Sequence, residues 1–303
     1  MKDLRNYFES LHLPQGVDIQ ASKRTFPDKA HFRIEVAAVN SIQCFQGLLS
    51  RARELGLVIN RVTETWGISR HTNEELRAYL DLGKENGIEI VFSTRVQSGL
   101  AACASRDSAY KLQGMEQVTG AADDVRRVTD LGGHNVVVYD EGLLWVLHKM
   151  RSDQKLPSNL RLKTSVHMAY ANPAALRVLE VLGADSISVA RQLSLSAIAA
   201  TREVIQVPLD VHADNPPQYD LTRSYEVPAI VRAAAPVYLK AGSSELFADA
   251  GRTGIEHGRR MAELAMIARD IIARTAPEVS QSAQGAFLCD EARCQVLSLP
   301  IAI

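Results

Sequence analysis

Nine charged or imidazole side chains in this sequence share one kind of position, because each lies at or just after the end of a short apolar run. Carboxylates, imidazoles and cations that gather at one opening are retained when they pair with one another or bind a ligand. These side chains are therefore the first candidates for chemistry, with ion pairing among themselves as the alternative. They are Glu35, Glu64, Arg95, Asp140, His167, Arg191, His212, Asp214 and Lys240.

The cations among them favour binding of an anion. Arg95, Arg191 and Lys240 are suited to a carboxylate or phosphate group, which arginine holds with two parallel hydrogen bonds. A Gly-Ser-Ser stretch with Ser243 at its centre follows the last apolar run, where backbone N–H groups often hold phosphate. We expect Glu35 and Asp140 to complete the substrate-binding set.

The imidazoles and their neighbours favour acid–base or metal chemistry. His212 and Asp214 are two residues apart, so in extended backbone they point to the same side. With His167 and Glu64 they form the predicted catalytic set, in which a carboxylate orients a histidine that titrates near neutral pH. His167, His212 and Asp214 also form a candidate set of ligands for a divalent metal, and this alternative stays open.

The elements that must position these residues are eight short apolar runs, each followed by a stretch with helical spacing. Eight alternations of strand and helix predict a single-domain (β/α)₈ TIM barrel, whose active site lies at the C-terminal ends of the strands. The runs span residues 32–36, 58–64, 88–95, 135–140, 162–167, 186–191, 207–212 and 237–240.

We expect residues 1–30 to form an N-terminal cap, residues 31–275 the barrel and residues 276–303 a C-terminal tail. The long connection 96–133 is a candidate lid over the site, since long loops on this face of a barrel often cover it. The apolar end of the tail, residues 295–303, is expected to pack on the barrel or on a second copy of the chain, so a homo-oligomer is one prediction.

Composition narrows the class of protein. The chain has 303 residues, of which 46% are hydrophobic and 23% charged, and its formal net charge is −1. The sequence has no basic block, which argues against a nucleic-acid partner, and no apolar run near the roughly 20 residues needed to cross a bilayer. The start of the chain is charged and unlike a secretory signal, so a cytoplasmic protein is expected.

Common catalytic motifs are missing from the sequence. It contains neither a Gly-x-Ser-x-Gly nucleophile elbow nor a Gly-x-Gly-x-x-Gly dinucleotide fingerprint. The four cysteines are Cys44, Cys103, Cys289 and Cys294, and in a reducing compartment they are not expected to form disulfides. No cofactor is identified beyond the divalent metal considered above.

One part of the sequence resembles the collagenase-like peptidases of unknown catalytic type, peptidase family U32. The stretch that carries the resemblance most specifically is residues 164–212. It contains the segments VHMAYANPAA (166–175), LGAD (182–185), VARQLSL (189–195) and LDVH (209–212). The resemblance implies a barrel and places Arg191 and His212 among the site residues. It also implies either peptidase activity or, as in the wider group, oxygen-independent hydroxylation at an iron–sulfur cluster.

The chain departs from the family pattern at two places. Gln192 stands where the family usually has glutamate, and no cysteine follows His212, where family members carry them. A cluster needs about four thiolates brought together, so an iron–sulfur cluster is not expected in this divergent member.

The sequence therefore predicts a TIM-barrel enzyme that acts on an anionic small molecule or short peptide by acid–base chemistry, with or without a divalent metal. The alternatives are a metal-dependent lyase or isomerase, and a non-catalytic barrel that serves as a subunit of a complex.

Overall fold

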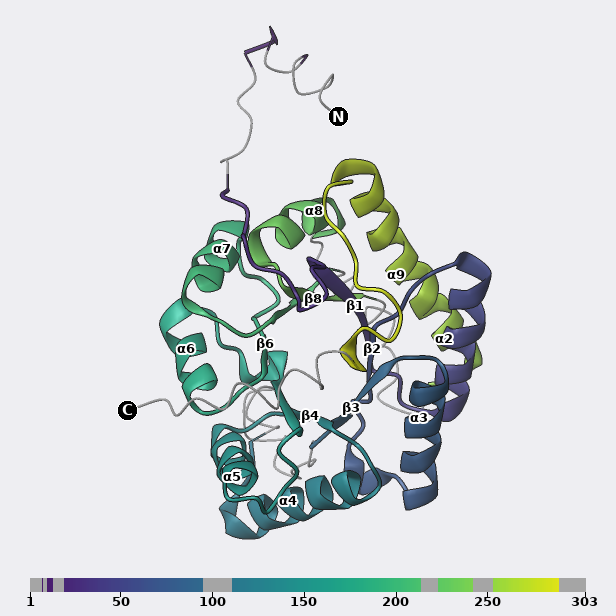
Figure 1. The fold of residues 1–303 in the computed structure, drawn as a ribbon, viewed down its shortest axis with the longest axis vertical. Coiled ribbons are helices and arrows are strands. Elements are labelled where there is room, and N and C mark those ends of the chain that lie inside the picture. The colour runs from purple at the N-terminus through teal and green to yellow at the C-terminus, as the bar shows by residue number, and fades with distance from the viewer. Residues whose placement is uncertain are drawn as a thin grey trace, which may run out of the picture.

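The computed structural model is a closed barrel of eight parallel strands in the order β1 to β8, with a helix after each strand (Figure 1). It describes residues 7, 10–12, 19–94, 111–213, 223–241 and 253–288. The prediction of a (β/α)₈ TIM barrel is confirmed. The strands are β1 (Phe32–Ala37), β2 (Arg61–Thr63), β3 (Glu89–Ser93), β4 (Asn135–Val138), β5 (Arg161–Thr164), β6 (Ser186–Ser188), β7 (Leu209–His212) and β8 (Val237–Ala241).

The helices form the outer ring and begin at residues that can cap them. Thr72 and Glu75 make the reciprocal capping box that starts α3, and Gly56 ends α2 in the left-handed conformation. The helices are α2 (Ile42–Leu55), α3 (Asn73–Glu85), α4 (Gly114–Asp130), α5 (Glu141–Ser152), α6 (Pro173–Val181), α7 (Leu195–Val204), α8 (Arg223–Ala234) and α9 (Ile255–Thr275), with short 3₁₀ turns η1 (Ile68–Arg70) and η3 (Val166–Met168).

Several strands are shorter than their apolar runs. The run 162–167 ends as a strand at Thr164, because Ser165 caps the 3₁₀ turn that contains His167. The run 135–140 ends at Val138, because the Asp140 side chain accepts a hydrogen bond from the Leu143 amide and starts α5. His167, Asp140, Glu64 and Arg191 therefore lie in loops or caps just beyond the strands rather than on them.

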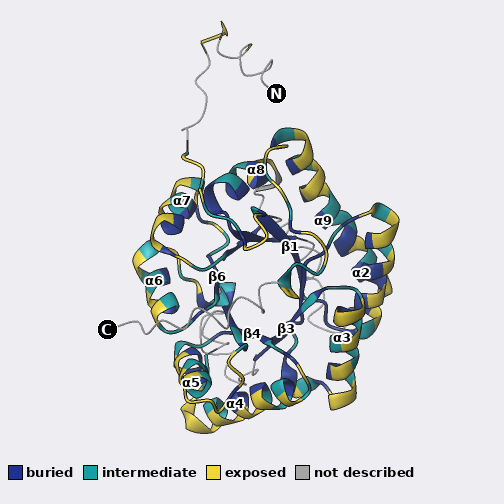
Figure 2. Cartoon of the chain, viewed as in Figure 1, coloured by how far each residue is buried: buried dark blue, intermediate teal, exposed yellow. Residues whose placement is uncertain are grey.

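The apolar core lies between the strands and the ring of helices. Alternate residues of each strand point outward, and in β1 these are Phe32, Ile34 and Val36, all fully buried (Figure 2). The residues between them, Arg33 and Glu35, face the barrel axis and are also buried. The outer layer is thus an ordinary hydrophobic core, whereas much of the barrel interior is charged, and a small apolar cluster of Val91, Val137 and Tyr139 lies apart from the main core.

Segments that precede and follow the barrel in the sequence close its N-terminal end. Phe32 of β1 pairs with Gln281, and the Asn60 side-chain amide donates to the carbonyl of Ser282. On the other side Ser22 donates its amide to the carbonyl of Arg232 in α8. The site must therefore open at the opposite, C-terminal end. The candidate lid is described from Lys111 onward and includes α4, while residues 1–6 and 289–303 lie outside the described residues.

No helix among the described residues has the length and apolar character needed to cross a membrane.

Helices α2 and α9 pack at close range because a glycine stands at each contact. A Cβ added at Gly258 would overlap the carbonyl oxygen of Cys44, and one added at Gly47 would overlap the carbonyl oxygen of Ile255. Both obstacles are backbone atoms, so neither can move aside without displacing a helix.

We expect Gly258→Ala to destabilise the protein by about 1–3 kcal/mol, the usual effect of overpacking. Gly120→Ala is the matched control, because a Cβ at this exposed position of α4 meets no atom within 4 Å. It should leave stability unchanged or raise it by up to about 1 kcal/mol through helix propensity. Urea unfolding followed by circular dichroism measures both, and equal midpoints would contradict the close packing.

Candidate functional site

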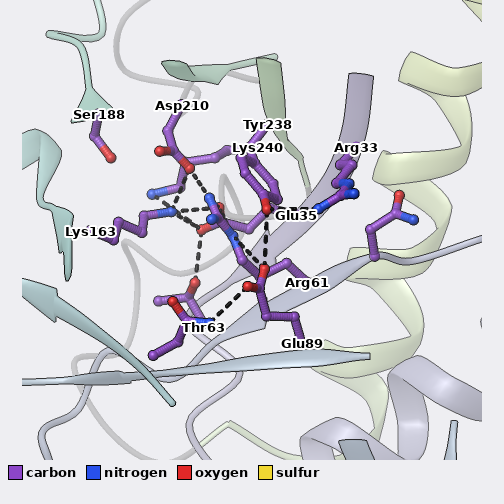
Figure 3. Close-up of polar contacts among 12 residues, drawn as sticks. Arg33, Glu35, Arg61, Thr63, Glu89, Lys163, Ser188, Asp210, Tyr238 and Lys240 are labelled. Carbon is purple, nitrogen blue, oxygen red and sulfur yellow. Dashed lines mark hydrogen bonds and ion pairs between the residues drawn. The ribbon is translucent and has the colours of Figure 1, made fainter. Parts of the chain in front are cut away.

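A buried ion network occupies the middle of the barrel (Figure 3). Glu35 of β1 accepts hydrogen bonds from the Arg61 guanidinium, from Lys163 Nζ at 2.6 Å and from the Thr63 hydroxyl at 2.8 Å. Asp210 of β7 pairs with the same Arg61 guanidinium and accepts from Lys163 Nζ at 2.7 Å. Two carboxylates and two cations from four strands are thus joined across the barrel axis.

Below this network, toward the N-terminal end, a second polar layer continues it. The Arg61 guanidinium lies 3.2 Å from the centroid of the Tyr238 ring, within range of a cation–π interaction. The Tyr238 hydroxyl accepts from Arg33 at 3.2 Å and donates to Glu89 at 3.3 Å, and Arg33 Nε donates to Ser282 Oγ. These contacts tie the barrel floor to the tail.

The network keeps Glu35 ionised. Burial alone would raise the pKa of this carboxyl, but Arg61, Lys163 and Lys240 together lower it well below 4.5. Glu35 was a candidate for substrate binding, and the structure places it inside the network, with its oxygens engaged by Arg61, Lys163 and Thr63.

Toward the C-terminal end lies His212, the last residue of β7. It is paired in register with Lys240 of β8, whose Nζ lies 3.8 Å from Glu35 Oε1. Burial lowers the pKa of His212 well below 6.5, and the positive charges of Arg191 and Lys240 lower it further. The imidazole is therefore neutral at physiological pH, in a region that two cations make positive.

Three buried side chains at this end have hydrogen-bonding atoms that no described residue satisfies. They are both ring nitrogens of His212, the hydroxyl of Ser188 and Oδ2 of Asp210. Each of these residues is at most 2% exposed. Buried polar atoms in native proteins nearly always have a partner in the protein, in water or in a ligand. The set therefore marks where a bound group can make hydrogen bonds.

A second cluster lies beside the strand ends of β1 and β2. Glu64 accepts from the amide of Gly67 at 2.9 Å and lies 3.3 Å from His71 Nε2, whose other nitrogen is 3.6 Å from Glu75. His71 and Glu75 line a cavity of about 190 Å³ together with Asn40, Ser41, Ile42, Gln43 and Tyr79. Glu64 thus shapes the loop after β2 and contacts a histidine that we had not singled out.

On the other side of the opening, His167 stacks on the Tyr139 ring with centroids 6.2 Å apart, and Ser93 donates to the Tyr139 hydroxyl at 3.1 Å. Asp140 points away from this stack and caps α5, with the Leu143 amide 3.0 Å from Oδ1. The structure therefore brings together Arg191, His212 and Lys240, but it gives Asp140 a capping position.

Arg95, Asp214 and Ser243 lie outside the described residues, so the metal set of His167, His212 and Asp214 stays a prediction. Within residues 19–94, 111–213, 223–241 and 253–288, no three His, Cys, Asp or Glu side chains are grouped as ligands of a metal ion.

The cysteines do not fit a cluster held by four thiolates. Cys44 is buried in α2 with its Sγ 3.9 Å from the sulfur of Met261 in α9, and burial raises its pKa to about 11. This thiol faces the helix packing and not the barrel opening. Cys103, Cys289 and Cys294 lie outside the described residues, and three cysteines cannot supply four ligands.

Sequence reasoning missed Arg61, Lys163, Ser188 and Asp210, because each lies inside an apolar run of the sequence and none of them ends a run. A signal was present, since apolar and charged residues alternate in Phe32-Arg33-Ile34-Glu35-Val36. Such alternation in a strand that is covered by helices on its outer side indicates a polar barrel interior.

Comparison with known proteins confirms the family resemblance for part of the chain. Residues 110–215 match the model of peptidase family U32, which includes the segment 164–212 that carries the resemblance. Comparison with curated proteins gives no match.

Similar solved structures share the barrel. The U32 peptidase Mk0906 is 19% identical, with a TM-score of 0.41 over 74% of this chain and 81% of that one. The YdjI aldolase from Escherichia coli K12 is 14% identical, with a TM-score of 0.49 over 81% and 92%. Thiamine phosphate pyrophosphorylase from Pyrococcus furiosus is 11% identical, with a TM-score of 0.48 over 80% and 98%. At these identities they tell nothing about activity.

We expect Glu35→Gln to destabilise the protein by about 3–5 kcal/mol at pH 7, because it removes one of the two carboxylates that offset the buried charges of Arg61 and Lys163. The pKa of Glu35 is lowered in the folded state, so its contribution is complete above pH 4.5 and is lost as the pH falls below that value. The variant should therefore lose less stability than the wild type on acidification.

The measurement is the free energy of unfolding from urea titrations between pH 3 and 7. Glu203→Gln, at an exposed position of α7, is the control and should match the wild type at pH 7. If Glu35→Gln were as stable as this control, the network would not hold the barrel together.

Proposed function

We propose that this chain, which carries a peptidase family U32 segment, is a TIM-barrel enzyme that binds an anionic small molecule or short peptide at the C-terminal strand ends and acts on it through His212. The observation that carries the proposal is the environment of His212. It is a buried, neutral imidazole without hydrogen bonds to the described residues, and it lies beside two cations.

Arg191 and Lys240 are the proposed anion-binding residues. The positive charge of each lowers the pKa of His212, and each lies next to β7, since Arg191 follows β6 and Lys240 belongs to β8. Their positive charges are concentrated where the barrel opens, and a carboxylate or phosphate group placed there would offset them. We include Arg95 and Ser243 in the proposed anion site from their sequence positions.

His212 is the proposed acid–base group. A neutral imidazole has one nitrogen that accepts a proton and one that donates a hydrogen bond. An anion bound beside the two cations would cancel part of the repulsion that keeps the ring neutral, so the histidine would become a stronger base when substrate is present. Asp214 is proposed to orient the ring, because it follows two residues later in the sequence.

The family match supports a hydrolase of the peptidase type as the leading class of reaction. His167 and Glu64 stay in the proposal as residues that border the opening. A divalent metal at His212, as in a lyase or isomerase, is a distinct reaction class, and metal analysis of the purified protein would detect it.

Replacement of Arg191 by Met should weaken binding of succinate about tenfold or more, because a charged hydrogen bond is worth about 1.5–3 kcal/mol. Isothermal titration calorimetry with succinate as the probe measures this loss. Arg269→Met, at an exposed position of α9, removes the same charge far from the opening and should bind like the wild type. Equal affinities in all three proteins would overturn the anion site.

His212→Ala should reduce turnover by about 10²–10⁴-fold on any substrate that the wild type converts, which is the range typical of a lost acid–base group. The substrate is sought by mass spectrometry of short peptides and small carboxylates incubated with the wild type. His134→Ala, at a position outside the barrel opening that contacts Asn159, is the control. A folded His212→Ala protein with unchanged turnover would remove His212 from the mechanism.

A further inference from the structure

Ser188 and Asp210 form a pair of neighbouring polar side chains inside the barrel that the proposed mechanism does not use. They lie in register on the neighbouring strands β6 and β7, so both side chains face the barrel axis. Ser188 is 2% exposed and Asp210 is fully buried. The Ser188 hydroxyl and Asp210 Oδ2 have no hydrogen-bond partner among the described residues.

The surrounding contacts hold this pair in place. The other oxygen of Asp210, Oδ1, is engaged by Arg61 and by Lys163, which fixes the direction of the carboxylate (Figure 3). The Ser188 amide donates to Thr164 Oγ1 at 3.3 Å, which anchors the backbone that carries the hydroxyl. In Figure 3 the Ser188 side chain is drawn on the side of Lys163 and Asp210, with its hydroxyl directed toward them.

The chemistry of the pair selects one kind of partner. An ionised carboxylate oxygen only accepts hydrogen bonds, whereas a hydroxyl can donate or accept. A ligand group that donates to Asp210 and exchanges a hydrogen bond with Ser188 is therefore a hydroxyl or an amino group. A second carboxylate or a phosphate is disfavoured at this position, because Asp210 would repel it.

The pair lies at a defined place relative to the anion site. Asp210 precedes His212 by two residues in β7, which separates them by about 7 Å along the strand on the same face. Arg191 and Lys240, the proposed anion-binding cations, lower the pKa of His212, which lies nearer the barrel opening than the pair. A ligand that reaches both places carries its anionic group at the barrel opening and its hydroxyl or amino group a few bonds deeper.

We propose that Ser188 and Asp210 are a specificity site for substrates that carry a hydroxyl or amino group close to the anion, that is, hydroxy or amino carboxylates. This inference rests on the proposed function, since it takes the anion site at Arg191 and Lys240 as given. It adds two residues to that site and narrows its substrate class.

The test compares three dicarboxylates of nearly equal size: succinate, malate and aspartate. Malate adds one hydroxyl to the succinate skeleton and aspartate adds one amino group, so the comparison isolates the added donor. Calorimetric titrations with both enantiomers of malate and aspartate should show at least one of them binding the wild type about tenfold or more tightly than succinate.

Ser188→Ala is the variant that tests the residue. It should reduce the preference over succinate to less than about threefold and leave the affinity for succinate unchanged. Ser186→Ala is the matched control, because Ser186 lies two residues earlier on the same strand and is also buried, yet its hydroxyl is not among the unsatisfied atoms. It should keep the preference of the wild type. Thermal unfolding verifies that both variants are folded.

The outcomes separate this inference from the proposed function. If succinate, malate and aspartate bind equally and all depend on Arg191, the specificity site is wrong and the anion site stands. If a preference exists but Ser188→Ala keeps it, the pair is not its source and the inference is also overturned. If none of the three binds in a way that depends on Arg191, the proposed function itself fails.

Discussion

The barrel depends on the ion network that joins Glu35, Arg61, Lys163 and Asp210 across its axis. Charged groups taken out of water are strongly destabilising unless they are paired and hydrogen-bonded. Here each carboxylate contacts both cations, and residues from β1, β2, β5 and β7 contribute. All four strands must therefore take their register for the four charges to be satisfied together. The network links strand order to stability more strictly than an apolar filling would.

The same constraint determines which groups remain for a ligand. Because Glu35 and one oxygen of Asp210 are held by cations, the network cannot offer them to a substrate without breaking itself. Among the described residues, it leaves the second oxygen of Asp210, the Ser188 hydroxyl level with it on β6, and the His212 ring nearer the opening. Asp210 thus contributes to both, because its Oδ1 belongs to the ion network and its Oδ2 is left for a ligand.

The fold could be predicted from the sequence, because alternation of strand and helix is a local pattern that neighbouring residues carry. The interior network could not, since its partners are far apart in the chain. Arg61 lies 149 residues from Asp210, and Lys163 lies 128 residues from Glu35. Which inward side chains meet depends on the tilt and stagger of the closed barrel, which no single strand encodes.

The sequence predicts strand-end positions for His212 and Lys240, and the structure places them in register at the C-terminal ends of β7 and β8, while their role in the site stays a proposal. Asp140 has a second use that the same pattern fits, because a carboxylate just after a strand is also what the first turn of a following helix needs. The two uses look alike in a sequence. They differ in whether a free helix amide lies within reach, and only the backbone conformation decides that.

The distribution of charge along the barrel axis bears on the proposed anion site. Among the described inward residues, Arg33 and Glu89 balance one another through Tyr238 at the floor. Arg61 and Lys163 balance Glu35 and Asp210 in the middle. At the opening, Arg191 and Lys240 add positive charge beside His212, and the carboxylate that acts on this histidine is Glu35, which Arg61 and Lys163 already engage. An anion placed in the proposed site would meet this positive charge in a low-dielectric setting, where electrostatic attraction is strong. Glu35 pairs with the cations of the network and also lies 3.8 Å from Lys240, so the proposed anion site and the network that holds the barrel together share one carboxylate.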